Sequence, residues 1–152
     1  MGLYIVSNKM TTINPYLSFN GNCEEAFNFY KSVFGGEFQF IGRYEDLPAT
    51  DRQNFSSVSD DKIMHVSLPI SAQNILMGCD SSETHEEATI FGNNIVLSVN
   101  TDTKLEADRL FNGLSVGGQI KSPMSDTFWG AYFGTLIDKF GINWTISFEK
   151  GQ

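Results

Sequence analysis

Leu17-Ser18-Phe19-Asn20 and Leu97-Ser98-Val99-Asn100 are nearly the same four residues, about eighty positions apart. Each is followed by a stretch with helical spacing of apolar residues and then by a glycine pair, Gly35-Gly36 or Gly117-Gly118. A strand, a helix and a glycine pair in the same order predict two copies of one supersecondary unit. Because such units bury their apolar faces on each other, a cleft between their equivalent strands is a natural place for a ligand.

The first copy predicts four strands and one helix. The strands are expected over residues 13–19, 37–43, 62–70 and 73–79. The helix is expected to begin after Asn22, with Glu25 completing a capping box, and to end at Gly35. Residues 44–61 are polar and show no clear periodicity, so we expect a long loop there that covers the site as a lid.

The second copy repeats this order. Strands are expected over 94–99, 119–122, 129–137 and 143–148, with a turn at 122–126. The helix is capped by Thr101, Asp102 or Thr103. Each half is thus β-α-β-β-β. We predict an α+β fold built from two such modules.

Length and composition indicate one globular domain of 152 residues, with module one at 13–80, a linker at 81–92 and module two at 93–149. The net charge is -8 and no basic stripe is present, so nucleic acid is not an expected partner. Cys23 and Cys79 lack Cys-x-x-Cys spacing, which favours free thiols in a reducing compartment. Residues 1–12 hold too short an apolar stretch for a signal peptide or membrane span, so we expect a cytoplasmic protein with no membrane partner.

A series of short motifs along residues 13–148 resembles the PhnB-like proteins of the vicinal oxygen chelate superfamily, which includes glyoxalase I, bleomycin-binding proteins and extradiol dioxygenases. The motifs are Pro15-Tyr16-Leu17, Gly21-Asn22-Cys23-Glu24-Glu25-Ala26, Met64-His65, Leu76-Met77-Gly78-Cys79-Asp80, Phe128-Trp129-Gly130 and Asp138 to Trp144. The resemblance implies that the two β-α-β-β-β modules form a curved mixed sheet around a cavity. Each module is a half-barrel with its concave side toward the cavity and a helix on its convex side. In the enzymes of the superfamily, the cavity holds a divalent metal that chelates two substrate oxygens.

The positions that this resemblance implies for metal ligands carry poor donors. They are Asn14 or Pro15, Asn94 or Ile95, residues 76–78, and residues near Thr145. Zinc, iron and manganese sites need several imidazole, thiolate or carboxylate groups. We therefore expect neither a metal at these positions nor a cofactor.

Five residues are candidates for contact with a ligand: Asn14, His65, Asn94, Trp129 and Tyr132. The resemblance places Asn14 and Asn94 on equivalent first strands, facing the cavity. Strand alternation places His65 with Ile63 and Ser67, opposite Val66 and Leu68. His65 is either a structural histidine or a group that lines the cavity. Likewise, the aromatic residues either pack in the core or a dimer interface, or stack on a flat ligand.

The leading hypothesis is a protein that binds a small organic molecule without the superfamily's metal, as a homodimer. One alternative is a lyase or isomerase that uses His65 as a base or holds a metal in a non-standard site. Another is a structural dimer whose cavity is filled by side chains. PhnB-like chains are sometimes labelled demethylubiquinone methyltransferases, but the sequence shows no nucleotide-type βαβ unit for S-adenosylmethionine.

Overall fold

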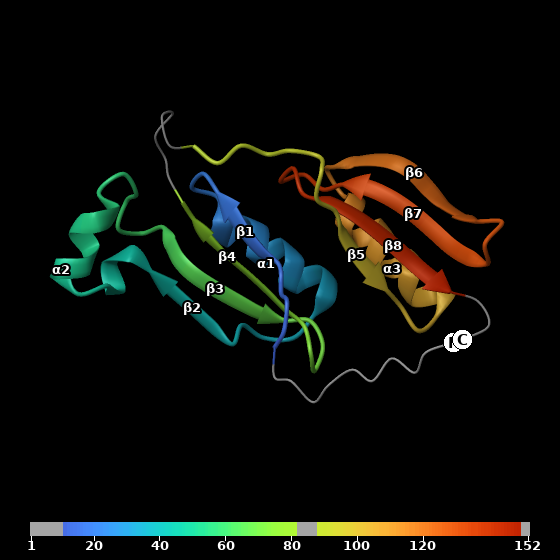
Figure 1. Cartoon of the computed structure of the whole chain (residues 1–152), viewed down its shortest axis with the longest axis horizontal. Helices are drawn as coiled ribbons and strands as arrows, with labels where there is room; N and C mark the ends of the chain where they lie inside the picture. Colours follow the sequence, from blue (N-terminus) through green and yellow to red (C-terminus); the bar gives the residue numbers. More distant parts are fainter. Residues whose placement is uncertain (1–10, 82–87, 150–152) are drawn as a thin grey trace.

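The computed structural model describes residues 11–81 and 88–149, so six residues of the predicted linker and most of the segment 1–12 lie outside it. Two four-stranded sheets, one from each half of the chain, lie side by side (Figure 1). Two long helices lie on one side of these sheets, one behind each. No helix in the described ranges is long and apolar enough to cross a membrane.

The first sheet has the strand order β1-β4-β3-β2. β1 runs parallel to β4, and the other neighbours are antiparallel. Its elements are β1 (Tyr16–Phe19), α1 (Cys23–Phe34), β2 (Phe40–Arg43), β3 (Ile63–Pro69) and β4 (Ile75–Asp80).

The second sheet repeats that arrangement with the order β5-β8-β7-β6, in which β5 is parallel to β8. Its elements are β5 (Leu97–Asn100), α3 (Lys104–Ser115), β6 (Gln119–Asp126), β7 (Ala131–Ile137) and β8 (Asn143–Glu149). The predicted α+β fold with two β-α-β-β-β units is confirmed. The two sheets do not close into a barrel over the described residues.

The predicted long loop at residues 44–61 is wrong, because the segment contains three short helical pieces. They are η1 (Tyr44–Asp46), α2 (Ala49–Arg52) and η2 (Gln53–Phe55). The segment is attached to the sheet, since the Tyr44 hydroxyl donates to the Asp80 carbonyl at 2.6 Å. Val58 is also buried in it. α2 lies beyond the ends of β2 and β3 rather than over the face of the sheet (Figure 1).

The predicted turn at residues 122–126 is also wrong. β6 continues from Gln119 to Asp126 and passes through Pro123. A proline is tolerated here because β6 is an edge strand, where one side of the backbone needs no partner. The pairing with β7 shifts register on both sides of Ser122, which accommodates the missing N–H of Pro123.

The expected capping box at the start of α1 does not form, since Asn22 makes no side-chain capping bond. A distant carboxylate serves the helix instead. Asp80, at the end of β4, accepts hydrogen bonds from the backbone N–H groups of Gly21 (2.9 Å), Cys23 (3.0 Å) and Ile63 (2.9 Å). Since an acceptor at a helix N-terminus satisfies otherwise unpaired N–H groups, Asp80 holds α1, β3 and β4 in place. In the second half the cap is Thr103, which accepts from Glu106 N.

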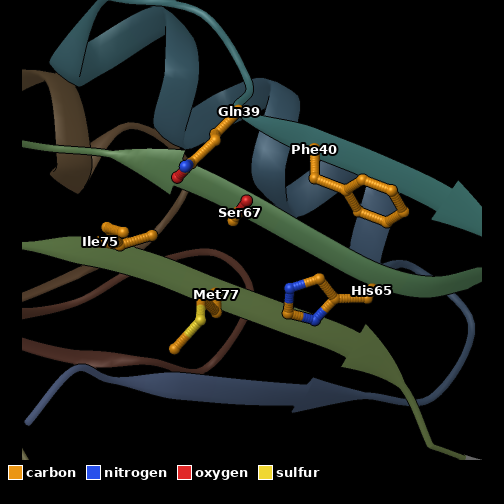
Figure 2. Close-up of a pocket in the computed structure, with 6 residues that line it drawn as sticks. All are labelled: Gln39, Phe40, His65, Ser67, Ile75 and Met77. Carbon is orange, nitrogen blue, oxygen red and sulfur yellow. The ribbon is translucent and has the colours of Figure 1, made fainter.

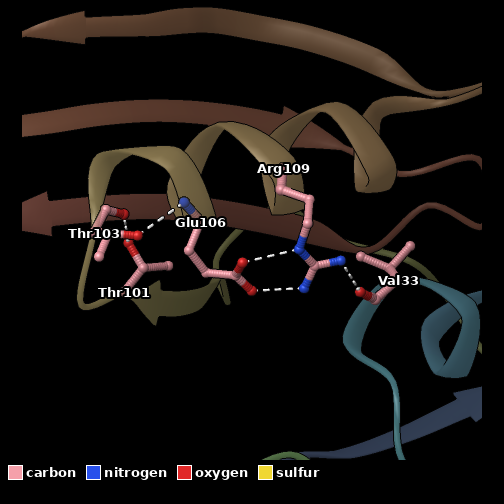
Figure 3. A network of polar contacts seen from close by, with 5 residues as sticks. All are labelled: Val33, Thr101, Thr103, Glu106 and Arg109. Carbon is pink, nitrogen blue, oxygen red and sulfur yellow. Dashed lines mark hydrogen bonds and ion pairs between the residues drawn. The ribbon is translucent and has the colours of Figure 1, made fainter.

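One buried and one partly buried polar contact join the halves. Asp138, at the end of β7, accepts from the Tyr30 hydroxyl of α1 at 2.6 Å and from the Trp144 indole N–H of β8 at 2.8 Å. The second contact lies between the helices, where Arg109 of α3 donates to the Val33 carbonyl at 2.8 Å (Figure 3). Glu106 orients that guanidinium through an ion pair. The hydrophobic core lies between the helices and the faces of the sheets that they cover.

The other face of the first sheet carries no helix and is open. Along β3, Val66 and Leu68 are fully buried in the core, whereas His65 is half-buried on the opposite face. Ile63 is also fully buried, which differs from the predicted alternation. The reason is a β-bulge in β3. Gly42 of β2 pairs with His65, and the next residue, Arg43, pairs with Ile63, so that Met64 is the extra residue of the bulge.

Candidate functional site

A depression of about 540 Å³ lies on the open face of the first sheet. Figure 2 shows its six lining side chains on one face of β2, β3 and β4, with α1 behind the strands. They are Gln39, Phe40, His65, Ser67, Ile75 and Met77. We call this depression the His65 pocket. All of its lining residues belong to the first half of the chain. The repeat had instead predicted a cleft between equivalent strands of the two halves.

Strand alternation explains this lining. Ile75 and Met77 of β4 point to the open face because Leu76 and Gly78, between and beside them, are buried toward α1. Across the ladder, Met77 pairs with Ser67, which pairs in turn with Phe40 of the edge strand. One row across three strands therefore combines a thioether, a hydroxyl and an aromatic ring. The pocket has apolar walls with a few polar groups, as small-molecule sites commonly do.

His65 lies in this pocket between two aromatic rings. Its imidazole stacks on Tyr16 of β1, with ring centroids 5.6 Å apart and an interplanar angle of 29°. Phe40 is on its other side, with centroids 5.8 Å apart. The Tyr16 hydroxyl is 3.1 Å from His65 Nδ1. Nε2 has no hydrogen-bond partner among residues 11–81 and 88–149, so it is available to a ligand.

Tyr16, which contacts the imidazole, and the neighbouring Cys79 are weak acids that stay protonated at neutral pH. Burial raises the pKa of Tyr16, and the neighbouring Cys79 raises it further. Burial likewise raises the pKa of the Cys79 thiol, which also interacts with Tyr16 and Ser18. Since the thiolate is the reactive form of cysteine, Cys79 is not set up here as a nucleophile.

Of the five predicted ligand contacts, His65 lines the pocket, and Asn14 is hydrogen-bonded to the backbone of Ile75, which also lines it. Asn14 precedes β1 rather than lying in it, and its Oδ1 accepts from the backbone N–H of Ile75 at 3.0 Å. Its Nδ2 donates to Thr12. Both ends of this amide are therefore used to fix the start of β4, next to a pocket residue.

The other three predicted contacts lie elsewhere. Asn94 is exposed and precedes β5, since that strand begins only at Leu97. Trp129 is 60 % exposed beside Phe128 in the β6–β7 turn. The Tyr132 hydroxyl donates to Asp108 of α3 at 2.5 Å, which places this side chain on the helix-covered face of the second sheet.

The residues at the positions expected for metal ligands do not fit a divalent metal. Asn14 is committed to the backbone of β4, and Asn94 lies outside its strand. Met77 and Thr145 supply a thioether and a hydroxyl in place of imidazole or carboxylate. Within the described ranges, no three His, Cys, Asp or Glu side chains come together as a possible metal site.

Several pocket residues were not among the predicted contacts. Ser67 was placed on the face of His65 by alternation. Ile75 and Met77 could have been found by the same reasoning applied to β4. Gln39 and Phe40 give a weaker signal, because β2 is only four residues long and Gln39 precedes it. The pairing of Tyr16 with His65 spans 49 positions and left no local pattern in the sequence.

Comparison with known proteins agrees with the fold and the motifs. The family model described as 3-demethylubiquinone-9 3-methyltransferase matches residues 11–147. Protein YjdN of Escherichia coli strain K12 is 29 % identical over 146 residues, which cover 92 % of this chain and 97 % of YjdN.

Solved structures show the same relationship. Protein PA1353 from Pseudomonas aeruginosa is 37 % identical, with a TM-score of 0.76 over 91 % of this chain and 98 % of its own. A structure from Bacillus cereus titled as a putative 3-demethylubiquinone-9 3-methyltransferase, PhnB protein, is 28 % identical with a TM-score of 0.71, over 91 % and 99 % of the two chains. A glyoxalase/bleomycin resistance protein/dioxygenase family enzyme from Burkholderia phytofirmans shares the fold, with 17 % identity and a TM-score of 0.55 over 90 % and 95 %. The chain therefore belongs to the PhnB-like family described by the 3-demethylubiquinone-9 3-methyltransferase model.

Proposed function

We propose that this protein binds a small organic molecule in the His65 pocket, without a metal of the superfamily type. The observation that carries the proposal is the combination of apolar walls, formed by Phe40, Ile75 and Met77, with an imidazole nitrogen that has no partner in the described chain. Apolar walls supply affinity through desolvation, and a few placed polar groups supply orientation. Gln39 adds an amide, which both donates and accepts.

The donor set supports a metal-independent site. His65 is the single strong transition-metal ligand among the six lining residues, and one imidazole does not hold zinc or iron. Both cysteines are free, with Cys23 buried and Cys79 half-buried. Free thiols suit a reducing compartment, which supports the proposal of a cytoplasmic protein.

The pocket also bears on the rival hypotheses. Its volume of about 540 Å³ shows that side chains of the described part of the chain do not fill this depression. The activity in the family model's description is not part of the proposal. Nucleotide-binding βαβ units place the two strands that flank the helix beside each other as parallel neighbours in one sheet. Here β1 and β2 flank α1 in sequence but lie at opposite edges of the sheet.

The test is a thermal-shift screen of chelator-treated protein against a library of small metabolites. A molecule that binds the native state raises the midpoint of unfolding, by an amount that grows with the logarithm of its concentration relative to its Kd. We expect at least one hit, and we expect His65→Ala to abolish its shift, because the variant removes the central polar group and one wall of the pocket.

Thr135→Ala is the matched control. Thr135 is the equivalent of His65 in the second sheet. Across the first sheet, Leu17 pairs with Gly78, which pairs with Val66, the residue after His65. Across the second, the repeated Leu97 pairs with Trp144, which pairs with Leu136, the residue after Thr135. It is half-buried, as His65 is. The control should keep the full ligand-induced shift. Equal shifts in His65→Ala and the wild type would show that the ligand binds elsewhere.

A further inference from the structure

The hydrogen bond between Tyr16 and His65 can form in two ways. Either the phenol donates to Nδ1 and the imidazole proton is on Nε2, or Nδ1–H donates to the phenol oxygen and Nε2 is unprotonated. The two atoms are 3.1 Å apart in both cases. The two arrangements differ in what the pocket offers to a ligand, since one presents a donor at Nε2 and the other an acceptor.

The surroundings of Tyr16 favour donation by the phenol. Burial and the neighbouring Cys79 raise the pKa of Tyr16, so the hydroxyl keeps its proton and needs an acceptor. The nearby alternative is the sulfur of Cys79, and a thiol sulfur is only a weak acceptor. An unprotonated imidazole nitrogen is a much stronger one. The stacking of the two rings, with centroids 5.6 Å apart, holds the phenol and the imidazole in this geometry.

We propose that Tyr16 is a positioning residue, whose hydroxyl fixes His65 as the Nε2–H tautomer and so makes the pocket a site for ligands with a carbonyl-type acceptor. The tautomer follows from contacts within the chain alone, whereas the ligand class rests on the proposed function. None of the six lining side chains is a formal cation or anion with His65 neutral. An uncharged acceptor fits this lining better than a carboxylate, which would lack a counter-charge.

This assignment also separates binding from one of the catalytic alternatives. In the Nε2–H tautomer, the nitrogen that faces the ligand carries a proton and has no free lone pair. It can donate to a carbonyl oxygen, but it cannot remove a proton from the ligand. The Nε2–H form therefore argues against a lyase or isomerase in which His65 acts as the base.

The first test is ¹⁵N NMR of protein labelled on its two histidines, with His85→Gln used to assign His65. Protonated and unprotonated ring nitrogens resonate in widely separated ranges, so a neutral ring reports its tautomer directly. We expect the wild type to show a protonated Nε2 and an unprotonated Nδ1. In Tyr16→Phe, which keeps the stacked ring, the tautomer is no longer fixed, so the Nδ1 resonance should move toward the N–H range and the Nε2 resonance away from it.

Tyr132→Phe is the matched control. It also removes one tyrosine hydroxyl, but that hydroxyl contacts Asp108 on the helix-covered face of the second sheet. The resonances of His65 should not change in this variant. A protonated Nδ1 in the wild type would overturn the proposal, as would an unchanged Nδ1 in Tyr16→Phe.

The second test uses acetophenone, which is flat, uncharged and carries one carbonyl, beside ethylbenzene, which lacks the carbonyl, and benzoate. We expect acetophenone to shift both the Met77 methyl signal and His65 Nε2. Ethylbenzene should shift Met77 alone, and benzoate should bind more weakly than acetophenone. Shifts at Met77 without any effect of acetophenone on Nε2, or tighter binding of benzoate, would refute the ligand class while leaving the proposed pocket intact. If none of the three probes shifts Met77, both the ligand class and the pocket are contradicted, whereas the tautomer is decided by the first test.

Discussion

Removing the Tyr30 hydroxyl should destabilise the protein by breaking the buried contact between its two halves. Tyr30→Phe keeps the ring, which packs against Phe27 and Trp144 with centroids 5.6 Å and 5.7 Å away. It removes one hydrogen bond of 2.6 Å to the Asp138 carboxylate. Tyr30 is fully buried and Asp138 is 3 % exposed, so water cannot replace the lost donor.

The size of the effect follows from what Asp138 keeps. Its carboxylate still accepts from the Trp144 indole at 2.8 Å and from the backbone N–H groups of Phe140 and Ile142. One charge-assisted hydrogen bond of four is lost, and such a bond contributes about 1.5–3 kcal/mol. For a chain of this length, that corresponds to a fall in Tm of roughly 3–12 °C.

Urea denaturation followed by tryptophan fluorescence measures this change, with an unaltered m-value as the sign that the transition remains two-state. Tyr132→Phe is the control, because its hydroxyl donates to Asp108 in a partly exposed contact. That variant should lose about 1 kcal/mol or less. A loss in Tyr30→Phe no larger than in Tyr132→Phe would refute the reasoning that Asp138 joins the halves.

Three further predictions concern packing, pH and assembly. Gly78→Ala should cost about 1–3 kcal/mol, since its Cβ would lie 2.6 Å from the Phe27 ring and 2.7 Å from the Leu17 carbonyl oxygen; Gly92→Ala, with a nearest atom at 3.5 Å, should be nearly neutral in the same urea titration. Burial, together with Asp138, raises the pKa of Tyr30, so its contribution to stability is complete below about pH 10 and falls progressively as the pH rises from there toward the raised pKa; the wild type should therefore lose stability more steeply than Tyr30→Phe in denaturation above pH 10. We also expect a homodimer that survives reduction, because Phe128 is 98 % and Trp129 60 % exposed in this chain and both cysteines are free; light scattering at micromolar concentration that gives a monomer would contradict this.

The repeat in the sequence predicted both sheets because each half carries its own strand and helix patterns. Helical spacing of apolar residues and the closing glycines are local signals, and α1 and α3 follow them closely. Period-two alternation also placed His65 and Ser67 on the face opposite Val66 and Leu68. The same argument failed at Ile63, because the bulge at Met64 adds one residue and reverses the alternation before it. The sequence of β3 contains no pattern that predicts this bulge.

Features that depend on distant partners could not be predicted. Asp80 caps a helix that begins 57 residues earlier, so the nearby Asn22 was chosen instead. Pro123 was interpreted as a turn because the sequence does not show that β6 is an edge strand. The site was predicted around Asn14 and Asn94 from a superfamily pattern. The pocket instead depends on which side chains of β2, β3 and β4 the helix leaves uncovered.

Methyl NMR of protein labelled at its five methionines tests the proposed site most directly. Met77 lines the His65 pocket, whereas Met124 lies on β6 of the second sheet and serves as an internal reference. In the presence of a chelator, a ligand found by the metabolite screen should shift the Met77 methyl signal and leave that of Met124 unchanged. A ligand that shifts Met124 but not Met77, or whose binding disappears with the chelator, would contradict a metal-independent binding site in the His65 pocket.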